Sequence, residues 1–264
     1  MDYQGLCDKV IGIAIEAGQY IMDRMTGFTM SQVEVKGKNN FVTEVDKAAE
    51  GIIIERLRRL VQGAGFIAEE GTVQSRGEKY NWIIDPLDGT TNFIHHAPPV
   101  AVSIALTEND LPVIGVVYEV WLKEAFYAWK GGGAYLNGTA IRVSDTAEMK
   151  DALIAVGFPY HGEQRRQVFI QSLDHFLHAT HGVRRLGSAA ADLAYVACGR
   201  YEGFYEYNLA PWDVAAGALI VTEAGGKVSD FSGSNNFLFG KEIVASNSTV
   251  FSEFLNDVSR FMNP

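Results

Sequence analysis

Two carboxylates stand three residues apart, Asp85 and Asp88, directly after the apolar, β-prone segment Trp82–Ile84. At a strand end, carboxylates can project into a shared cavity, and their hard oxygen atoms suit Mg²⁺. Gly89 lets the backbone approach a ligand closely, and the amides and hydroxyls from Thr90 onward could face a phosphate. Asp-Pro and Asp-Gly are also ordinary turn dipeptides, so this segment alone is equally compatible with a simple strand end.

Further acidic residues follow a second strand or begin helices. Glu69 and Glu70 come directly after the short apolar strand 66–68. Adjacent acids repel one another unless positive charge lies near them, although solvated loop glutamates are a simpler alternative. Asp46 and Asp213 each fall in the first turn of an expected helix, where the helix dipole or a capping role explains an acid without any chemistry.

Other residues near these acids carry weaker signals. His95 and His96 adjoin the Asp85 segment, but no Cys or further His stands at zinc-ligand spacing, so zinc is not predicted. Lys36 lies in the polar segment 33–40, which reads as a strand end and loop. It could screen the carboxylates, but a solvated lysine is the simpler interpretation.

The composition is that of an ordinary globular protein. The 264 residues are 47% apolar and carry a formal charge of −10. This acidity argues against binding to nucleic acid or to an anionic membrane. Cys7 and Cys198 read as buried thiols, and we see neither a signal peptide nor an apolar run of the roughly 20 residues that a membrane helix needs. We therefore expect a cytoplasmic protein.

Hydrophobic spacing predicts that the chain forms two halves with different secondary structure within one compact body. Residues 1–145 read as two helices followed by a meandering, mostly antiparallel sheet, and residues 146–264 read as alternating strands and helices. No flexible linker separates these halves. The expected helices are 6–21, 43–60, 164–178, 188–197, 211–224 and 251–261, and the expected strands are 66–68, 82–84, 100–107, 113–119, 124–129, 152–156, 183–186, 203–207, 243–245 and short segments around 137–143 and 228.

Four segments resemble, in order, the motifs of the inositol monophosphatase family, the Mg²⁺-dependent, lithium-sensitive phosphatases related to fructose-1,6-bisphosphatase. They are Val42-Thr43-Glu44-Val45-Asp46, Phe66-Ile67-Ala68-Glu69-Glu70, Asp85-Pro86-Leu87-Asp88-Gly89-Thr90 and Trp212-Asp213-Val214-Ala215-Ala216-Gly217. The resemblance covers about residues 43–226 and implies a layered αβαβα sandwich, the sugar phosphatase fold. The segment 157–160 looks like bacterial members of the family.

The resemblance also implies a set of metal ligands and catalytic groups. Two Mg²⁺ ions, with a third, weaker one near Glu69, would serve hydrolysis of a phosphate monoester by water. Asp46 would pair with Thr90, and both would orient the attacking water and help to remove its proton. Glu70 would act only indirectly. The implied ligands are Glu69, Asp85 and the Leu87 carbonyl for one ion, and Asp85, Asp88 and Asp213 for the second.

Substrate contacts are implied in the same way. The amides of Gly89 and Thr90 would receive phosphate oxygens, while Asp88, the Ala189 amide and Glu206 would contact substrate hydroxyls. Ala189 lies at a helix entry, Gly187-Ser188-Ala189-Ala190, whose N-terminal amides are expected to be unpaired.

This favours inositol 1-phosphate over histidinol phosphate, fructose 1,6-bisphosphate, adenosine 3′,5′-bisphosphate or NADP⁺ as the substrate. Family members are commonly homodimers, so we expect one here. A non-catalytic regulatory protein on this scaffold is the alternative, since fold alone does not fix function.

Overall fold

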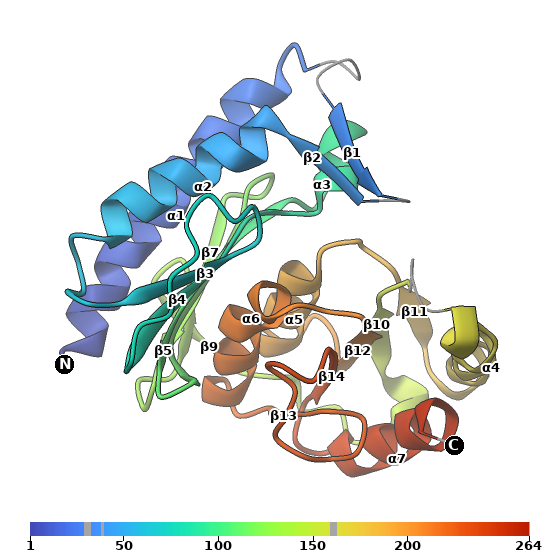
Figure 1. Cartoon of the computed structure of the whole chain (residues 1–264). Coiled ribbons are helices and arrows are strands. Elements are labelled where there is room, and N and C mark those ends of the chain that lie inside the picture. The colour runs from blue at the N-terminus through green and yellow to red at the C-terminus, as the bar shows by residue number, and fades with distance from the viewer. Residues whose placement is uncertain (29–32, 38–39, 159–162, 264) are drawn as a thin grey trace.

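The computed structural model describes residues 1–28, 33–37, 40–158 and 163–263. It stacks helices and sheets in five layers, which confirms the αβαβα fold class (Figure 1). Helices cover one face of a seven-stranded sheet, further helices fill the space between it and a five-stranded sheet, and a last pair covers the outer face of the second sheet. Pro159 and Tyr160 of the segment 157–160 and the side chain of Lys36 lie outside the described part of the chain.

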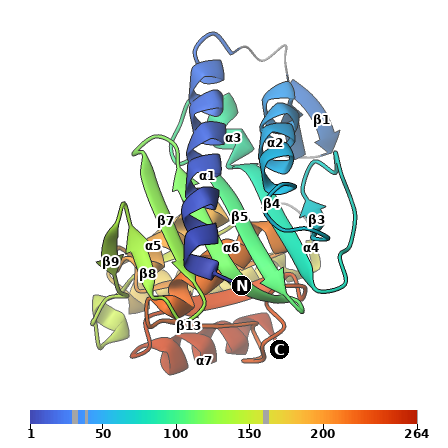
Figure 2. The ribbon, with the colours of Figure 1, turned by 90° about the vertical axis from the view of Figure 1, so that its left-hand side faces the viewer.

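The outermost layer is a pair of helices, α1 (Tyr3–Met25) and α2 (Glu44–Leu57), which lie across the seven-stranded sheet (Figure 2). The Asp2 carboxylate caps α1 by accepting a hydrogen bond from the Gly5 amide at 3.0 Å. Apolar residues at three- and four-residue spacing form the buried face of α1. None of the described helices is long and apolar enough to span a membrane.

The seven-stranded sheet is a meander in which β3 pairs parallel to β4 and the other neighbours pair antiparallel. The sequence placed a strand end at Ile84, but pairing with the next strand resumes at Asp88 after an irregularity, so the strand is longer than predicted. The strands, in sheet order, are β3 (Gly65–Ala68), β4 (Tyr80–Asp88), β5 (Ala101–Glu108), β6 (Leu111–Glu119), β7 (Glu124–Trp129), β8 (Ala134–Leu136) and β9 (Thr139–Ile141).

The remaining layers belong to the second half of the chain. The five-stranded sheet has the order β11-β10-β12-β14-β13 and mixes parallel and antiparallel pairs. Its strands are β10 (Leu153–Val156), β11 (Gly182–Arg184), β12 (Gly203–Tyr207), β13 (Lys227–Ser229) and β14 (Glu242–Ser246), and its helices are α4 (Glu163–Ala179), α5 (Ala189–Ala197), α6 (Pro211–Glu223) and α7 (Phe251–Met262).

Short elements complete the fold, and the sequence did not predict them as such. The segment expected to be a strand end and loop forms an antiparallel hairpin, β1 (Val33–Gly37) with β2 (Asn40–Thr43). A short helix, α3 (Thr90–Ile94), follows β4 directly, and a 3₁₀ turn spans Met149–Asp151.

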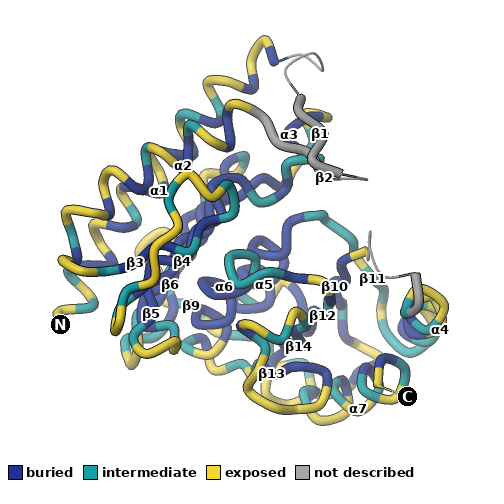
Figure 3. The backbone as a smooth tube through the Cα atoms, viewed as in Figure 1, coloured by how far each residue is buried: buried dark blue, intermediate teal, exposed yellow. Residues whose placement is uncertain are grey.

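A buried helix, α6, joins the two halves. Its central residues are apolar on all sides, as expected of a helix enclosed by protein, and Figure 3 shows this inner layer as buried. The backbones of β6 and α6 nearly touch, because a β-carbon built on Gly115 would lie 2.6 Å from the Ala216 carbonyl oxygen. The Ser103 hydroxyl also donates to the Trp212 carbonyl at 3.1 Å. These contacts set the position of α6 on the sheet.

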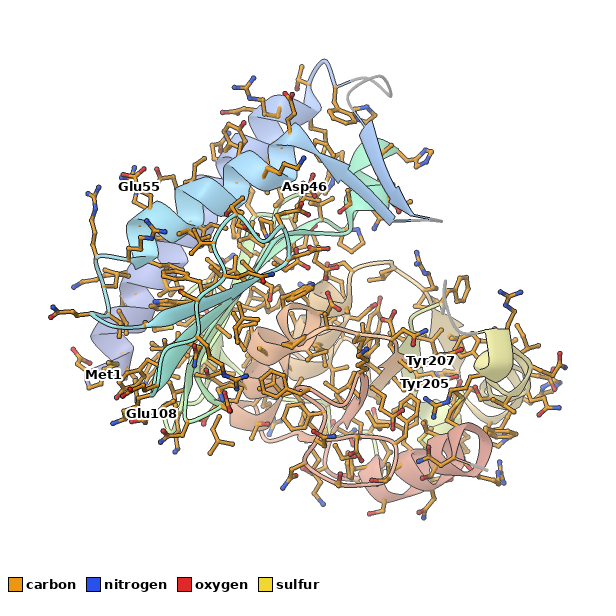
Figure 4. The ribbon with its side chains drawn as sticks, in the orientation of Figure 1. Met1, Asp46, Glu55, Glu108, Tyr205 and Tyr207 are labelled. Atoms are coloured by element: carbon orange, nitrogen blue, oxygen red, sulfur yellow. The ribbon has the colours of Figure 1, made fainter. Side chains whose placement is uncertain are left out.

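At the N-terminal end of α1, a polar cluster ties the helix to the sheet. Glu108 lies there, near Met1 in Figure 4, and accepts hydrogen bonds from the hydroxyls of Tyr3 at 2.5 Å and Tyr80 at 2.9 Å. The Lys79 ammonium lies 2.8 Å from the same carboxylate. The hydrogen bond from Lys79, followed by that from Tyr3, lowers the pKa of Glu108 to about 2.

We expect Gly115→Ala to destabilise the protein by about 1–3 kcal/mol, because the added methyl group would push β6 and α6 apart. Gly12→Ala is the matched control, since Gly12 is exposed in α1 with open space around its α-carbon and alanine favours the helix. Urea unfolding of both variants tests this. Equal stability of Gly115→Ala and the wild type would mean that the close approach of β6 and α6 does not constrain the fold.

Candidate active site

Strand β4 directs Asp85 toward the inner helices. Side chains alternate between the two faces of a strand. Trp82 and Ile84 pack in the core under α1 and α2, whereas Ile83 packs in the core formed with α5 and α6. Asp85 follows Ile83 by two residues and so emerges on the α6 side, where its Oδ1 accepts a hydrogen bond from the Leu87 amide at 2.9 Å.

The predicted site residues surround one cavity of about 230 Å³. They come from β4 and the loop after β3, from the start of α3, and from α5, β12 and α6, which are far apart in the sequence. Those that line the cavity are Glu69, Asp85, Leu87, Asp88, Gly89, Thr90, Ala189, Glu206 and Asp213.

Asp46 lies behind this cavity rather than in its wall. Its side chain is buried at the N-terminal end of α2, as its label in Figure 4 indicates. The Thr90 hydroxyl lies 3.2 Å from Asp46 Oδ1 and 3.2 Å from the Leu87 carbonyl oxygen, and it can donate to one of them at a time. The predicted pairing of Asp46 with Thr90 is therefore present.

Glu50 has a positioning role that the sequence did not reveal. It lies one helical turn after Asp46 and is fully buried. Its carboxylate accepts hydrogen bonds from the amides of Glu70 and Thr72, both at 2.8 Å, and from the Thr72 hydroxyl at 2.5 Å. Helix α2 thereby holds both the loop that carries Glu69 and the hydroxyl of Thr90.

The N-terminus of α5 is occupied by Asp88, which corrects the expectation that its amides are unpaired. Asp88 Oδ2 accepts hydrogen bonds from the Ser188 hydroxyl and from the Ala190 amide, both at 2.7 Å. The Ala191 amide donates to the Ser188 hydroxyl oxygen at 3.3 Å. The sequence pattern located the helix entry correctly, but the carboxylate that would fill it lies about a hundred residues earlier.

Burial raises the pKa of every proposed carboxylate ligand of the cavity, and repulsion from neighbouring carboxylates adds to this for Glu69, Asp85 and Asp213. Burial first, and then the charge of Asp88, raises the pKa of Asp213 to about 7. Burial also raises the pKa of Asp88 to about 6, although the hydrogen bonds from Ser188 and Ala190 oppose this rise. Burial is the main cause that raises the pKa of Glu69, to about 8, and the charge of Asp213 adds to it. Burial and then the charge of Glu69 raise the pKa of Asp85 well above its usual value.

The donor set fits a hard divalent cation in chemistry and in location. Glu69, Asp85, Asp88 and Asp213 offer only carboxylate oxygens, the ligands that Mg²⁺ prefers, and a cation would remove their repulsion. Among the described residues, however, no three His, Cys, Asp or Glu side chains are already arranged to hold one ion. Asp88 and Asp213 each use one oxygen to accept a hydrogen bond from a backbone amide: Asp88 Oδ2 from Ala190 at 2.7 Å and Asp213 Oδ2 from Ala210 at 2.6 Å.

Further residues of the cavity wall were not predicted. Gly157, Arg185, Asp192 and Asn208 all line it. A β-carbon on Gly157 would lie 2.0 Å from both carboxylate oxygens of Glu206, so only glycine leaves room for that side chain. The sequence contains no local signal for these roles, because each arises from contacts between distant segments.

Comparison with known proteins agrees with this geometry. The sequence pattern described as the inositol monophosphatase family matches residues 3–262, nearly the whole chain. The chain belongs to the inositol monophosphatase family. Its general activity is accordingly that of a phosphatase, and the fold and the motif resemblance point the same way.

The chain matches individual members of the family over nearly their full lengths. The chain is 39% identical to an inositol-1-monophosphatase of Mesorhizobium japonicum over 98% of each chain. It is 43% identical to the Nus factor SuhB of Escherichia coli, over 90% of this chain and 89% of that one. The crystal structure of the extragenic suppressor protein SuhB from Bartonella henselae matches with a TM-score of 0.92 at 36% identity, over 97% of this chain and 99% of that one.

We expect Asp213→Asn to stabilise the metal-free protein at pH 8 by an amount on the order of 2 kcal/mol. The folded pKa of Asp213 is raised, so its favourable contribution is present at low pH and is lost as the pH rises toward about 7. The gain should therefore shrink as the pH falls toward 5. The asparagine can still accept the hydrogen bond from Ala210.

Urea unfolding in the presence of a chelator measures this effect, with Asp174→Asn, at an exposed site on α4, as the control. A less stable Asp213→Asn at pH 8 would show that the carboxylates of the cavity do not repel one another.

Proposed function

We propose that this chain is a Mg²⁺-dependent phosphate monoester hydrolase whose preferred substrate is inositol 1-phosphate. The observation that supports this most is the gathering of four carboxylates, from the loop after β3 and from β4 and α6, around one cavity in a member of a phosphatase family. Burying several acids together costs folding free energy, and such clusters are characteristic of functional sites.

The residues that would hold the ions are those of the family motifs. Glu69, Asp85 and the Leu87 carbonyl would hold one Mg²⁺, and Asp85, Asp88 and Asp213 would hold the other, with a third, weaker ion near Glu69. Bound divalent ions would offset the negative charge of phosphate and carboxylates and polarise the attacking water.

The chain's own groups would orient the reactants. Asp46 and Thr90, already within hydrogen-bonding distance, would position the attacking water and accept its proton. Gly89 adopts a left-handed conformation, with φ of 97°, directly before α3. This turn brings the Gly89 and Thr90 amides to the cavity wall, where they would donate hydrogen bonds to phosphate oxygens.

The size and polarity of the cavity support a small polyol phosphate. Ala189 and Glu206 line it beside Asp88, in positions to contact substrate hydroxyls. Its volume of about 230 Å³ is below the ~300 Å³ where pockets for drug-sized ligands begin, which favours a single-ring ester over NADP⁺. Histidinol phosphate, fructose 1,6-bisphosphate and adenosine 3′,5′-bisphosphate are the other substrates for the same chemistry.

A regulatory role is the second candidate. The relatives named Nus factor SuhB support it, and it could accompany catalysis rather than replace it. A purely non-catalytic role is less well supported, because every proposed metal ligand is present and lines the cavity. We further propose a cytoplasmic homodimer.

Phosphate release from this panel of esters tests the function. We expect release from inositol 1-phosphate to require Mg²⁺, to stop with a chelator and to be suppressed by Li⁺. Preferential release from another ester would keep the chemistry and change the substrate. No release from any of them by folded protein would contradict the hydrolase and favour the regulatory role.

Asp88→Asn should reduce this Mg²⁺-dependent turnover by about a hundredfold or more while the protein stays folded, because a charged oxygen ligand of the proposed Mg²⁺ site is lost. The exposed Asp174→Asn variant is again the control and should keep full activity. Full activity of Asp88→Asn, with unchanged Mg²⁺ affinity in a calorimetric titration, would disprove the assigned ligand set.

A further inference from the structure

Asp192 is a buried acid with an oxygen that lacks a partner. It lies in the first turn of α5, only 1% of its side chain is exposed, and it lines the same cavity as the carboxylates of the family motifs. Its Oδ1 atom has no hydrogen-bond partner among the described residues. Buried polar atoms are almost always paired in folded proteins, and an unpaired one is costly, so this atom requires an explanation.

The described surroundings of Asp192 contain charged groups but no hydrogen-bond partner for that oxygen. Burial is the main cause that raises the pKa of Asp192 well above the usual value, and the charges of Glu206 and Asp88 add to it. Arg185 opposes that rise as the nearby cation. Apolar residues dominate the rest of α5, where Ala189, Ala190 and Ala191 precede the acid. An acid in such an apolar helix costs stability, and Asp192 is nevertheless present there, where it lines the cavity.

Asp192 and Glu206 approach the cavity from different elements. Asp192 comes from α5 and Glu206 from β12, and these elements pack against each other in the inner part of the molecule (Figure 1). Gly157 leaves space for the Glu206 carboxylate at the end of β10. The two acids and Asn208 therefore form a polar wall of the cavity whose groups are not among the proposed metal ligands.

We propose that Asp192 is a specificity-determining residue that hydrogen-bonds a hydroxyl group on the alcohol portion of the substrate. This inference rests on the proposed phosphatase function and adds Asp192 to the groups that would contact the alcohol portion of its substrate.

A hydroxyl is the group of a polyol ester that suits this oxygen. A phosphate oxygen brings negative charge and no proton, and a carboxylate would repel it. An apolar alcohol would leave Oδ1 unpaired when the cavity closes around it. A hydroxyl can both donate and accept, so it pairs with the acid in either protonation state. A site built in this way rejects analogues that lack the hydroxyl, because its own buried polar atom then stays unpaired.

Two esters that differ only in ring hydroxyls test the proposal. The readout is the ratio of kcat/KM for inositol 1-phosphate to that for cyclohexyl phosphate, each with saturating Mg²⁺. We expect Asp192→Leu, which has the same number of side-chain atoms, to lower this ratio by about 10- to 100-fold. Hydrolysis of cyclohexyl phosphate should change by about threefold or less, because that ester never paired with Asp192.

Two other variants separate recognition from structure. Asp192→Asn keeps polar atoms in place and should restore much of the ratio. Glu202→Gln neutralises another buried acid, whose oxygens accept from the Thr146 hydroxyl at 3.0 Å and the Leu153 amide at 2.6 Å, away from the cavity. We expect it to lower stability and leave the ratio unchanged.

The outcomes distinguish this inference from the proposed function. Equal losses on both esters, or no loss on either, would contradict the role of Asp192 while the phosphatase stands. Failure of the wild type to hydrolyse these two esters or any other ester of the panel would contradict the proposed function, and this inference with it. If Asp192→Leu does not fold, Asp192→Ala removes the carboxylate without added bulk and must lower the ratio in the same way.

Discussion

Like charges stay together in a protein interior only if other interactions hold them there. Here the packing of α6 against the seven-stranded sheet supplies those interactions. Asp85 and Asp88 come from the sheet, whereas Asp213 comes from a helix about 125 residues later in the chain. Their repulsion would separate sheet from helix if α6 could move. Close backbone contact at Gly115 and the apolar burial of α6 prevent that movement. A bound cation, as proposed here, would relieve this repulsion.

Hydrogen bonds around the carboxylates orient the groups of the site. Glu50 holds the loop that carries Glu69, and Asp46 holds Thr90, so one helix orients two parts of the site. The N-terminus of α5 holds Asp88. Such support matters because a functional group that is misplaced by about 1 Å loses much of its effect. The same helix, α5, also carries Asp192, which lines the cavity, so one element holds a proposed metal ligand and the acid proposed to recognise the substrate.

The carboxylates of the site could be predicted because they sit in contiguous motifs, and β3, β4 and the α6 entry have clear local patterns. Glu50 and Asp192 could not be predicted, because an acid on a helix surface and an acid in a buried helix look alike in sequence. Their roles depend on Thr72 and on the cavity, which only the tertiary fold brings near. The turn dipeptides at Asp85 and Asp88 also led to a wrong prediction of where the strand ends, because sheet pairing overrides local turn preference.

The most direct test of the account is a crystal structure of this protein grown with Mn²⁺, which binds the same oxygen ligands as Mg²⁺ and gives an anomalous signal. We expect anomalous peaks among Glu69, Asp85, Asp88 and Asp213, with the carboxylate oxygens turned toward them. A well-ordered cavity that holds no peak at saturating Mn²⁺, or peaks only elsewhere on the protein, would contradict the claim that cations balance these four charges.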